Sequence, residues 1–231
     1  MKLFDVAWTD VLGVLPRWER LPREVRLRLL ELFRPSGTAS PDTFGAHLAE
    51  IREMGVLVPA TSSGSRLGVA EEFRPLFRVL RAVYRHRLWD DSAPPALVRY
   101  LEEHFSVQDL QGVLDRTEWG WGWGNRQVVA QRVTAEEWVE GFLDEEAEKW
   151  EQKRLRPGDT ALLAGERGAA AQRLVREILR HPQGVPLREL PEHFVELDLP
   201  LLGAALHAAL HYLLLYAGTD AAGEARVGVW P

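Results

Sequence analysis

Residues 199–229 read LPLLGAALHAALHYLLLYAGTDAAGEARVGV, and they decide the fold of the C-terminal part of the chain. Asp198 directly precedes this stretch and offers a helix N-cap, so we predict a helix from 199 to about 213. Leu214–Tyr216 and Arg226–Val229 are short apolar runs on either side of a Gly-containing turn, a pattern typical of two paired strands. The stretch therefore predicts a long apolar helix followed by a β-hairpin.

A similar order of elements is expected near the N-terminus. Residues 23–33 place apolar side chains on one helical face, and Ser40 followed by Pro41 is a strong helix start for 41–54. Residues 56–58 and 66–69 then flank the polar turn TSSGS, which again predicts strand, turn and strand.

The two ends also share residues at matching positions. Several of these pairs are separated by 158 positions, and a few more align after small insertions in the turn. A duplicated unit and independent convergence on the same chemistry both remain open. The pairs at an offset of 158 are Gly45 with Gly203, Ala46 with Ala204, Leu48 with Leu206, Leu57 with Leu215 and Thr61 with Thr219.

This order of helix, turn, helix, strand, Gly-rich turn and strand resembles the winged-helix superfamily over 23–69 and 170–229. The resemblance implies a mainly α fold with short β wings, in which two winged-helix-like domains flank a helical middle segment. The short helix that usually lies between the first and last helices is not predicted in the first copy, because 34–40 reads as a turn. The expected divisions are 1–90, 91–156 and 157–231.

Composition excludes several classes of protein. The 231 residues include no cysteine, which excludes a disulfide scaffold and any Cys-ligated metal, and favours a cytoplasmic protein. The N-terminal start is no signal peptide. No nucleotide-binding or nucleophile motif is found, so we predict no catalytic residue, no cofactor, no metal site and no enzyme, although a catalytic domain beyond this chain remains open.

The charge is uneven along the chain. Residues 1–90 hold 14 basic and 11 acidic residues, whereas 91–150 hold 5 and 13, and the whole chain carries −6. Proteins that coat a duplex usually have a strong basic excess. Only residues 1–90 carry a basic excess, so only this part of the chain has a charge balance that favours nucleic acid.

The middle segment is predicted to be helical at about 95–105, 107–116 and 135–153. Between the last two, Trp residues alternate with Gly in TEWGWGWGNRQ. These side chains suit stacking on exposed bases, or anchoring of a loop or a protein partner. The candidates are Trp119, Trp121, Trp123, Asn125 and Arg126.

Candidate nucleic-acid contacts fall in the first copy and in a helix predicted at about 71–88. Helix 41–54 would enter a groove, the wing would meet phosphates, and Arg side chains at helical spacing would form a basic face. Acidic residues on helix 41–54 oppose this hypothesis, and pairing of the basic face with acids of the middle segment is the alternative. The candidates are Thr43, His47, Arg52, Ser63, Arg66, Arg74, Arg78, Arg81 and Arg85.

Helix 199–213 contains no Arg or Lys. It is apolar on most sides, which predicts burial against another domain, a protein partner or a second copy. His207 and His211 interrupt it, so we expect no membrane span. Their spacing would suit a metal, but no third ligand is evident, and we expect histidines of a helix interface.

Two functions follow from these patterns. The first is a nucleic-acid-binding module that acts as a regulator or as an accessory region of a larger DNA-processing protein. The second is a protein-interaction subunit, similar in general plan to the tandem winged-helix subunits that bind kleisin chains in chromosome-organising complexes.

Overall fold

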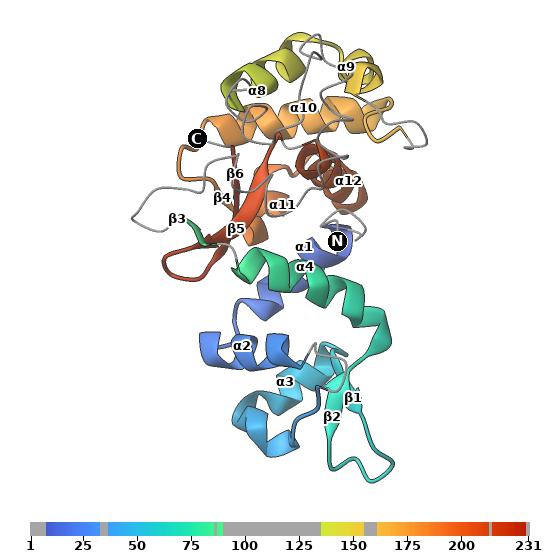
Figure 1. Ribbon diagram of the computed structural model, residues 1–231, viewed down its shortest axis with the longest axis vertical. Helices are drawn as coiled ribbons and strands as arrows, with labels where there is room; N and C mark the ends of the chain where they lie inside the picture. The colour runs from blue at the N-terminus through green and yellow to red at the C-terminus, as the bar shows by residue number, and fades with distance from the viewer. Residues whose placement is uncertain are drawn as a thin grey trace, which may run out of the picture.

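The computed structural model describes residues 8–32, 37–85, 87–89, 135–154, 161–212 and 214–229. Helices dominate these ranges, and the strands form two small sheets built mainly from antiparallel pairs (Figure 1). This confirms the prediction of a mainly α chain with short strands. The helices expected at about 95–105 and 107–116 lie outside the described residues.

The C-terminal elements form what we call the second unit, from α10 to β6. Its last strand, β6, lies in the middle and pairs antiparallel with both β4 and β5. The predicted cap is confirmed, because Asp198 accepts a hydrogen bond from the backbone N–H of Leu201 at 2.8 Å. In chain order the elements are α10 (Glu166–Leu179), β4 (Val185–Pro186), η3 (Leu187–Glu189), α11 (Leu190–His193), α12 (Leu199–His211), β5 (Tyr216–Asp220) and β6 (Ala225–Gly228).

The first unit, from α2 to β2, has the same order of elements. Here β2 lies in the middle, because Leu67 pairs with Pro59 of β1 on one side and forms an isolated bridge with Ala39 on the other. Ala39 therefore occupies the place that β4 has in the second unit. The elements are α2 (Arg23–Glu31), η1 (Pro41–His47), α3 (Leu48–Glu53), β1 (Leu57–Pro59) and β2 (Leu67–Val69).

The prediction of one continuous helix over 41–54 is wrong. Gly45 has φ 50° and ψ −129°, a conformation that L-residues rarely adopt, and it kinks the segment inside η1, so that the α-helix α3 begins only at Leu48. The segment thus begins with the short helix η1, which the sequence patterns did not separate from α3. The matched glycine Gly203 lies buried inside α12, so this pair occupies different structural positions.

Two helices connect the units. Helix α1 (Trp8–Trp18), which the sequence patterns did not reveal, packs on α12 and η3. Helix α4 (Arg74–Arg85), preceded by η2 (Glu71–Phe73), packs on α1, α2 and β5. The strand β3 (Arg87–Trp89) then adds to the second sheet, parallel to β5. The N-terminal part of the chain therefore adds a helix, α1, and a strand, β3, to the C-terminal unit.

Large aromatic side chains fill the contact between these helices. Trp18 of α1 packs edge-on against Phe77 of α4, with ring centroids 5.5 Å apart, and both side chains are fully buried. Such pairs contribute about 1 kcal/mol beyond the area they bury. The pair therefore joins α1, which packs on the second unit, to α4, which packs on α2 of the first unit and β5 of the second.

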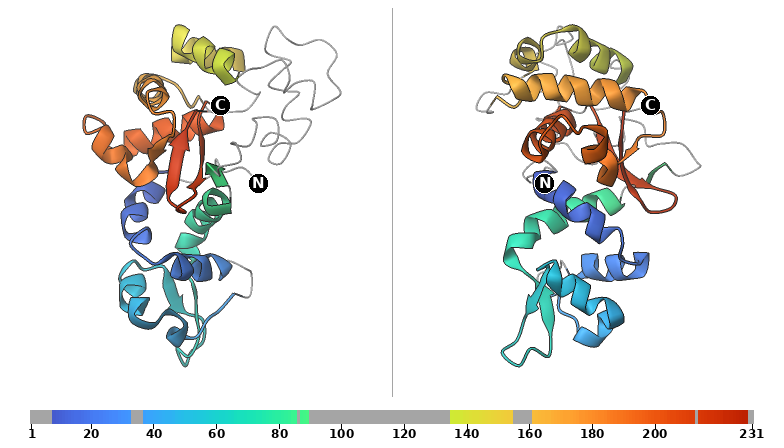
Figure 2. Two further views of the ribbon diagram at one scale, coloured as in Figure 1. Left: turned by 90° about the vertical axis from the view of Figure 1, so that its left-hand side faces the viewer. Right: turned by 180° about the vertical axis from the view of Figure 1, so that it is seen from behind.

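The remaining helices, α8 (Ala135–Asp144) and α9 (Ala147–Arg154), cover α10. The prediction of one helix over 135–153 is wrong, because the chain turns at 145–146. Trp150 of α9 is buried edge-on between Phe142 and Tyr212, with ring centroids 5.2 and 5.3 Å away. Figures 1 and 2 place α8 and α9 at one end of the molecule and the β1–β2 hairpin at the other. Among the described residues, no helix combines the length and the hydropathy that a membrane span requires.

Candidate nucleic-acid interface

The β1–β2 hairpin exposes a cluster of hydroxyl groups at its turn. Gly64, with φ 66°, closes the turn, and its N–H donates to the carbonyl of Thr61 at 2.9 Å. The hydroxyls of Ser63 and Ser65 are 2.8 Å apart, and those of Thr61 and Ser63 are 3.2 Å apart. All three side chains are exposed, so the turn offers several donors and acceptors to a polar ligand.

Arg66 at the base of this turn is held in place by Thr38. Its Nε donates to the Thr38 hydroxyl at 2.7 Å, and its Nη2 donates to the Thr38 carbonyl at 3.2 Å. Neither partner carries a charge, and Arg66 is exposed. A guanidinium oriented by neutral partners keeps its charge available to an anion.

Helix α3 lies beside this hairpin and exposes Arg52. The other two groups expected to read a groove, Thr43 and His47, are half-buried on η1. Arg28 of α2 donates to the Thr43 carbonyl at 3.0 Å and so attaches η1 to α2. Of the candidates in the first unit, Arg52, Ser63 and Arg66 are exposed.

Acidic side chains share this end of the molecule. Asp42 is exposed on η1, Glu53 is exposed on α3, and Glu50 is half-buried there. Over 23–32 and 37–69 the first unit carries five arginines and five acidic residues. Its surface is therefore mixed in charge rather than basic.

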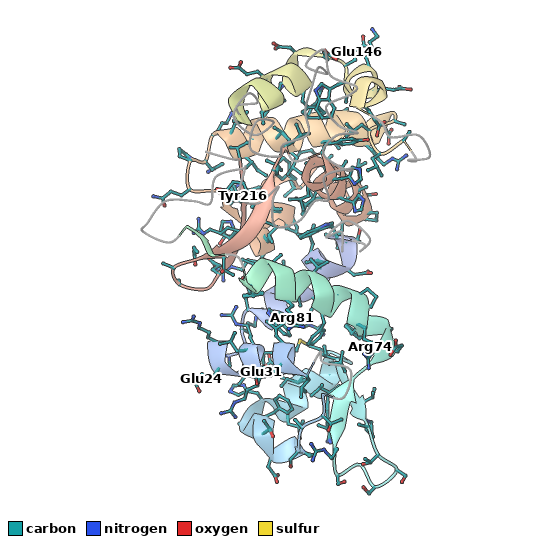
Figure 3. All side chains as sticks on the ribbon, in the orientation of Figure 1. Glu24, Glu31, Arg74, Arg81, Glu146 and Tyr216 are labelled. Atoms are coloured by element: carbon teal, nitrogen blue, oxygen red, sulfur yellow. The ribbon has the colours of Figure 1, made fainter. Side chains whose placement is uncertain are left out.

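The arginine helix α4 is mainly a core element. Arg74 pairs with Glu71 at 2.6 Å, and Arg81 is half-buried (Figure 3). The side chains of Arg78 and Arg85 lie outside the described residues, so the continuous basic face stays a prediction. The buried apolar residues described on α4 are Leu76, Phe77, Val79, Leu80 and Val83.

The acidic residues of the middle segment were expected to neutralise α4, but those that the structure describes do not lie beside it. Glu146, which directly precedes α9, pairs with Lys149 at 3.1 Å, and Figure 3 places it at the far end of the molecule from Arg74 and Arg81. Arg74 is instead neutralised by its own chain neighbour.

The apolar helix α12 is covered from within the chain. It packs on α10 on one side and on α1 on the other, and seven of its residues are buried. At Gly203 the approach of α1 is so close that a Cβ atom would lie 2.6 Å from the Thr9 nitrogen and 2.9 Å from its Cα. The burial predicted from its composition is thus provided by α1 and α10. Docking of a partner along 199–213 stays a prediction, but the apolar composition of this helix no longer supports it, because α1 and α10 already bury the helix.

His207 and His211 of α12 are stacked, with ring centroids 6.2 Å apart and planes 12° apart. Within the described ranges no three acidic or histidine side chains converge as metal ligands would. The pair is half-buried and lies on the helix surface.

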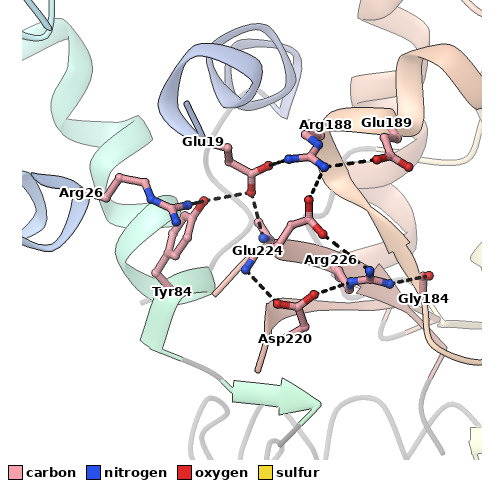
Figure 4. Close-up of polar contacts among 10 residues, drawn as sticks. Glu19, Arg26, Tyr84, Gly184, Arg188, Glu189, Asp220, Glu224 and Arg226 are labelled. Carbon is pink, nitrogen blue, oxygen red and sulfur yellow. Dashed lines mark hydrogen bonds and ion pairs between the residues drawn. The ribbon is translucent and has the colours of Figure 1, made fainter. Parts of the chain in front are cut away.

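A network of charged side chains lies where the two units meet (Figure 4). At its centre is Glu19, whose side chain is 3% exposed at the end of α1. Its Oε1 accepts from the Tyr84 hydroxyl at 3.1 Å and from the Ala225 N–H at 2.9 Å, and its Oε2 lies 3.5 Å from Arg188. Burial raises the pKa of Glu19, and burial likewise raises the pKa of Tyr84.

The turn between β5 and β6 supplies the other half of this network. Arg188 lies close to Glu224 as well as to Glu19, and Arg226 pairs with Asp220 at 2.8 Å. Sequence reasoning missed these residues because they come from four separate segments and form no local pattern. The 3.6-residue spacing of Trp8, Leu12, Leu15 and Trp18 was the signal that would have revealed α1.

The Trp–Gly stretch, with Trp119, Trp121, Trp123, Asn125 and Arg126, lies outside the described residues. No protein-family model, no curated protein and no solved structure matches this chain.

Proposed function

We propose that this protein binds nucleic acid through the first unit, with α3 and the β1–β2 hairpin as the contacting surface. Both units would be winged-helix domains, since each has a helix, a short strand or single bridge, two helical segments and an antiparallel hairpin in which the last strand lies in the middle. In such domains the third helix and the wing meet the duplex. The protein would act as a regulator or as an accessory region of a DNA-processing protein.

The observation that carries this proposal is the unequal exposure of α3 and α12, each of which is the last helix of its unit. Helix α12 is covered by α1, closely enough that Gly203 has no room for a side chain. Helix α3 and the neighbouring hairpin expose Arg52, Arg66 and three hydroxyls. We therefore assign contact to the first unit and internal packing to the second.

The mixed charge of this surface implies modest affinity. A protein contacting few phosphates binds with dissociation constants of roughly 10⁻⁴–10⁻⁶ M, and its binding weakens as salt rises. Each phosphate contact contributes a slope of about one in a plot of log affinity against log salt concentration.

Fluorescence anisotropy of labelled single- and double-stranded DNA at several salt concentrations tests this assignment. We expect duplex binding at low salt, and a weaker dependence on salt in the double variant Arg52→Glu, Arg66→Glu. Arg167→Glu is the matched control, since Arg167 is an exposed arginine on α10 with no ion pair in the described parts. Absence of binding at low salt, or equal loss in the control, would overturn the proposal.

The balance of charge on the first unit favours a second candidate function, a protein-interaction module. Five acidic residues beside five arginines suit a protein surface of mixed charge better than a polyanion. This function predicts no DNA binding and a change in sedimentation with concentration or with a co-purified subunit. The anisotropy titration therefore separates the two.

A further inference from the structure

Two arginines without acidic partners line one small cavity at the junction of the units. The cavity lies between α2 and the turn that joins β5 to β6, and it holds about 40 Å³. A water molecule needs roughly 10–15 Å³ by the same measure, so there is room for a group of a few heavy atoms and none for a large metabolite. Its lining includes Arg23, Arg26, Tyr84, Thr219, Asp220 and Gly223.

Arg26 is a buried cation that forms no direct ion pair with any described residue, and it reaches Glu19 only through the Tyr84 hydroxyl. It is 8% exposed, its Nη1 donates to the Tyr84 hydroxyl at 3.1 Å, and its guanidinium lies over the Tyr84 ring at 5.2 Å. Its Nε is buried and has no hydrogen-bond partner among the described residues. Burying a charged donor without a partner is costly, and such groups in native proteins usually contact a water or an ion.

Arg23 adds a second positive charge from the first turn of α2. It is exposed and forms no ion pair or hydrogen bond with the described residues, and it reaches over the turn at Gly223. A Cβ atom at Gly223 would lie 3.7 Å from the Arg23 Nε.

The one acidic residue in the lining is already engaged. Asp220 accepts from the Glu224 N–H through Oδ1 at 2.9 Å and from Arg226 through Oδ2 at 2.8 Å. Its charge is therefore neutralised from the side of the hairpin. Arg23 and Arg26 are then the cations of the lining that form no ion pair with a described residue.

We propose that this cavity is a binding site for a phosphate-type oxyanion, held by Arg23 and Arg26 between α2 and the β5–β6 turn. Arginine guanidinium groups bind phosphate oxygens through charge-assisted hydrogen bonds. The bound anion would connect the first unit to the second. The source is either free phosphate or a phosphate of nucleic acid, and the site does not depend on the contact assigned to α3 and the hairpin.

Calorimetric titration of the full chain with inorganic phosphate, at constant ionic strength set with sodium chloride, tests the site. We expect saturable binding in the wild type and in Arg20→Gln, whose arginine is exposed nearby but outside the lining. In Arg23→Gln the affinity should fall about tenfold or more, because a charge-assisted hydrogen bond is lost. Arg26→Gln should abolish binding. If Arg26→Gln fails to fold, the phosphate affinity of Arg23→Gln is sufficient to test the site.

Binding that is absent, that does not saturate, or that falls equally in Arg20→Gln and Arg23→Gln would overturn the site. A short duplex titrated into the same variants then identifies the source. Weaker duplex binding in Arg23→Gln, with competition by phosphate, assigns the anion to nucleic acid. Unchanged duplex binding, or no duplex binding at all, assigns it to free phosphate. The failure of the interface on α3 is thus separable from the failure of this site.

Discussion

At the scale of single residues, Glu19 is a buried carboxylate that connects the end of α1 to three other elements. It receives hydrogen bonds from α4 and from β6 while lying beside Arg188 of η3. A carboxylate in this position fixes the ends of three elements, yet burial makes its charge unfavourable. This conflict has a consequence that depends on pH.

The raised pKa of Glu19 predicts how stability changes with pH. Because the folded state holds this proton more tightly than the unfolded chain does, the contribution of Glu19 to the free energy of unfolding falls as pH rises from its ordinary value of 4.5 to the raised one. In Glu19→Gln, which keeps an acceptor oxygen for Tyr84 and Ala225, that fall should be missing. Urea unfolding from pH 4 to 8 measures it. A wild-type minus variant difference that stays flat, or grows with pH, would contradict the assignment.

The glycine at the α1–α12 contact predicts an effect of substitution. Gly203→Ala places a Cβ atom 2.6 Å from the Thr9 nitrogen, so we expect a loss of about 1–3 kcal/mol in the free energy of unfolding. Gly13→Ala is the control, because nothing lies within 4 Å of that position on α1. It should be neutral or stabilising by up to about 1 kcal/mol. Chemical denaturation compares the two, and equal effects would mean that α1 does not pack closely on α12.

At the scale of elements, the break at Gly45 separates the observed segment from the helix that the sequence predicts. If 41–54 were one helix, Gly45→Ala would stabilise it by about 1 kcal/mol. With φ at 50°, the same substitution should instead destabilise the protein by about 1–2 kcal/mol. The sign of the change in urea midpoint therefore distinguishes the two conformations.

A buried carboxylate also joins α9 to the end of α12. Glu151 is 1% exposed and accepts from the N–H groups of Leu162 and Leu163 and from the Tyr212 hydroxyl, the last at 2.9 Å. Tyr212→Phe removes one hydrogen bond to a charged acceptor, so we expect a loss of about 1.5–3 kcal/mol in thermal or urea unfolding. An unchanged midpoint would show that the hydroxyl contributes nothing.

These elements show what the sequence could predict. Local signals found α2, the β1–β2 hairpin, the Asp198 cap and α12, because capping residues, turn glycines and apolar spacing act over a few residues. The same local reasoning missed the break at Gly45, since Ser40, Pro41 and the apolar stripe all favour a helix. The backbone at a glycine is decided by packing that its neighbours in sequence do not reveal.

At the scale of the whole molecule, the sequence suggested two unequal copies but not how they are joined. The covering of α12 by α1 involves segments almost two hundred residues apart, so no window of sequence contains it. The same holds for the junction of Glu19, Arg26 and the β5–β6 turn, where the phosphate-type site is proposed. For the interface itself, exposed Arg52, Ser63 and Arg66 agree with the candidates named from sequence, whereas Thr43 and His47 are less accessible.

In this protein α3, the last helix of the first unit, is available for contact, whereas α12, the last helix of the second unit, is not. Hydrogen–deuterium exchange with and without a saturating DNA duplex at low salt tests it most directly. We predict added protection in residues 45–66, which hold α3 and the hairpin turn, and none in α12, which is already covered by α1 and α10. Protection of α12 on binding, or no added protection in 45–66, would contradict the account.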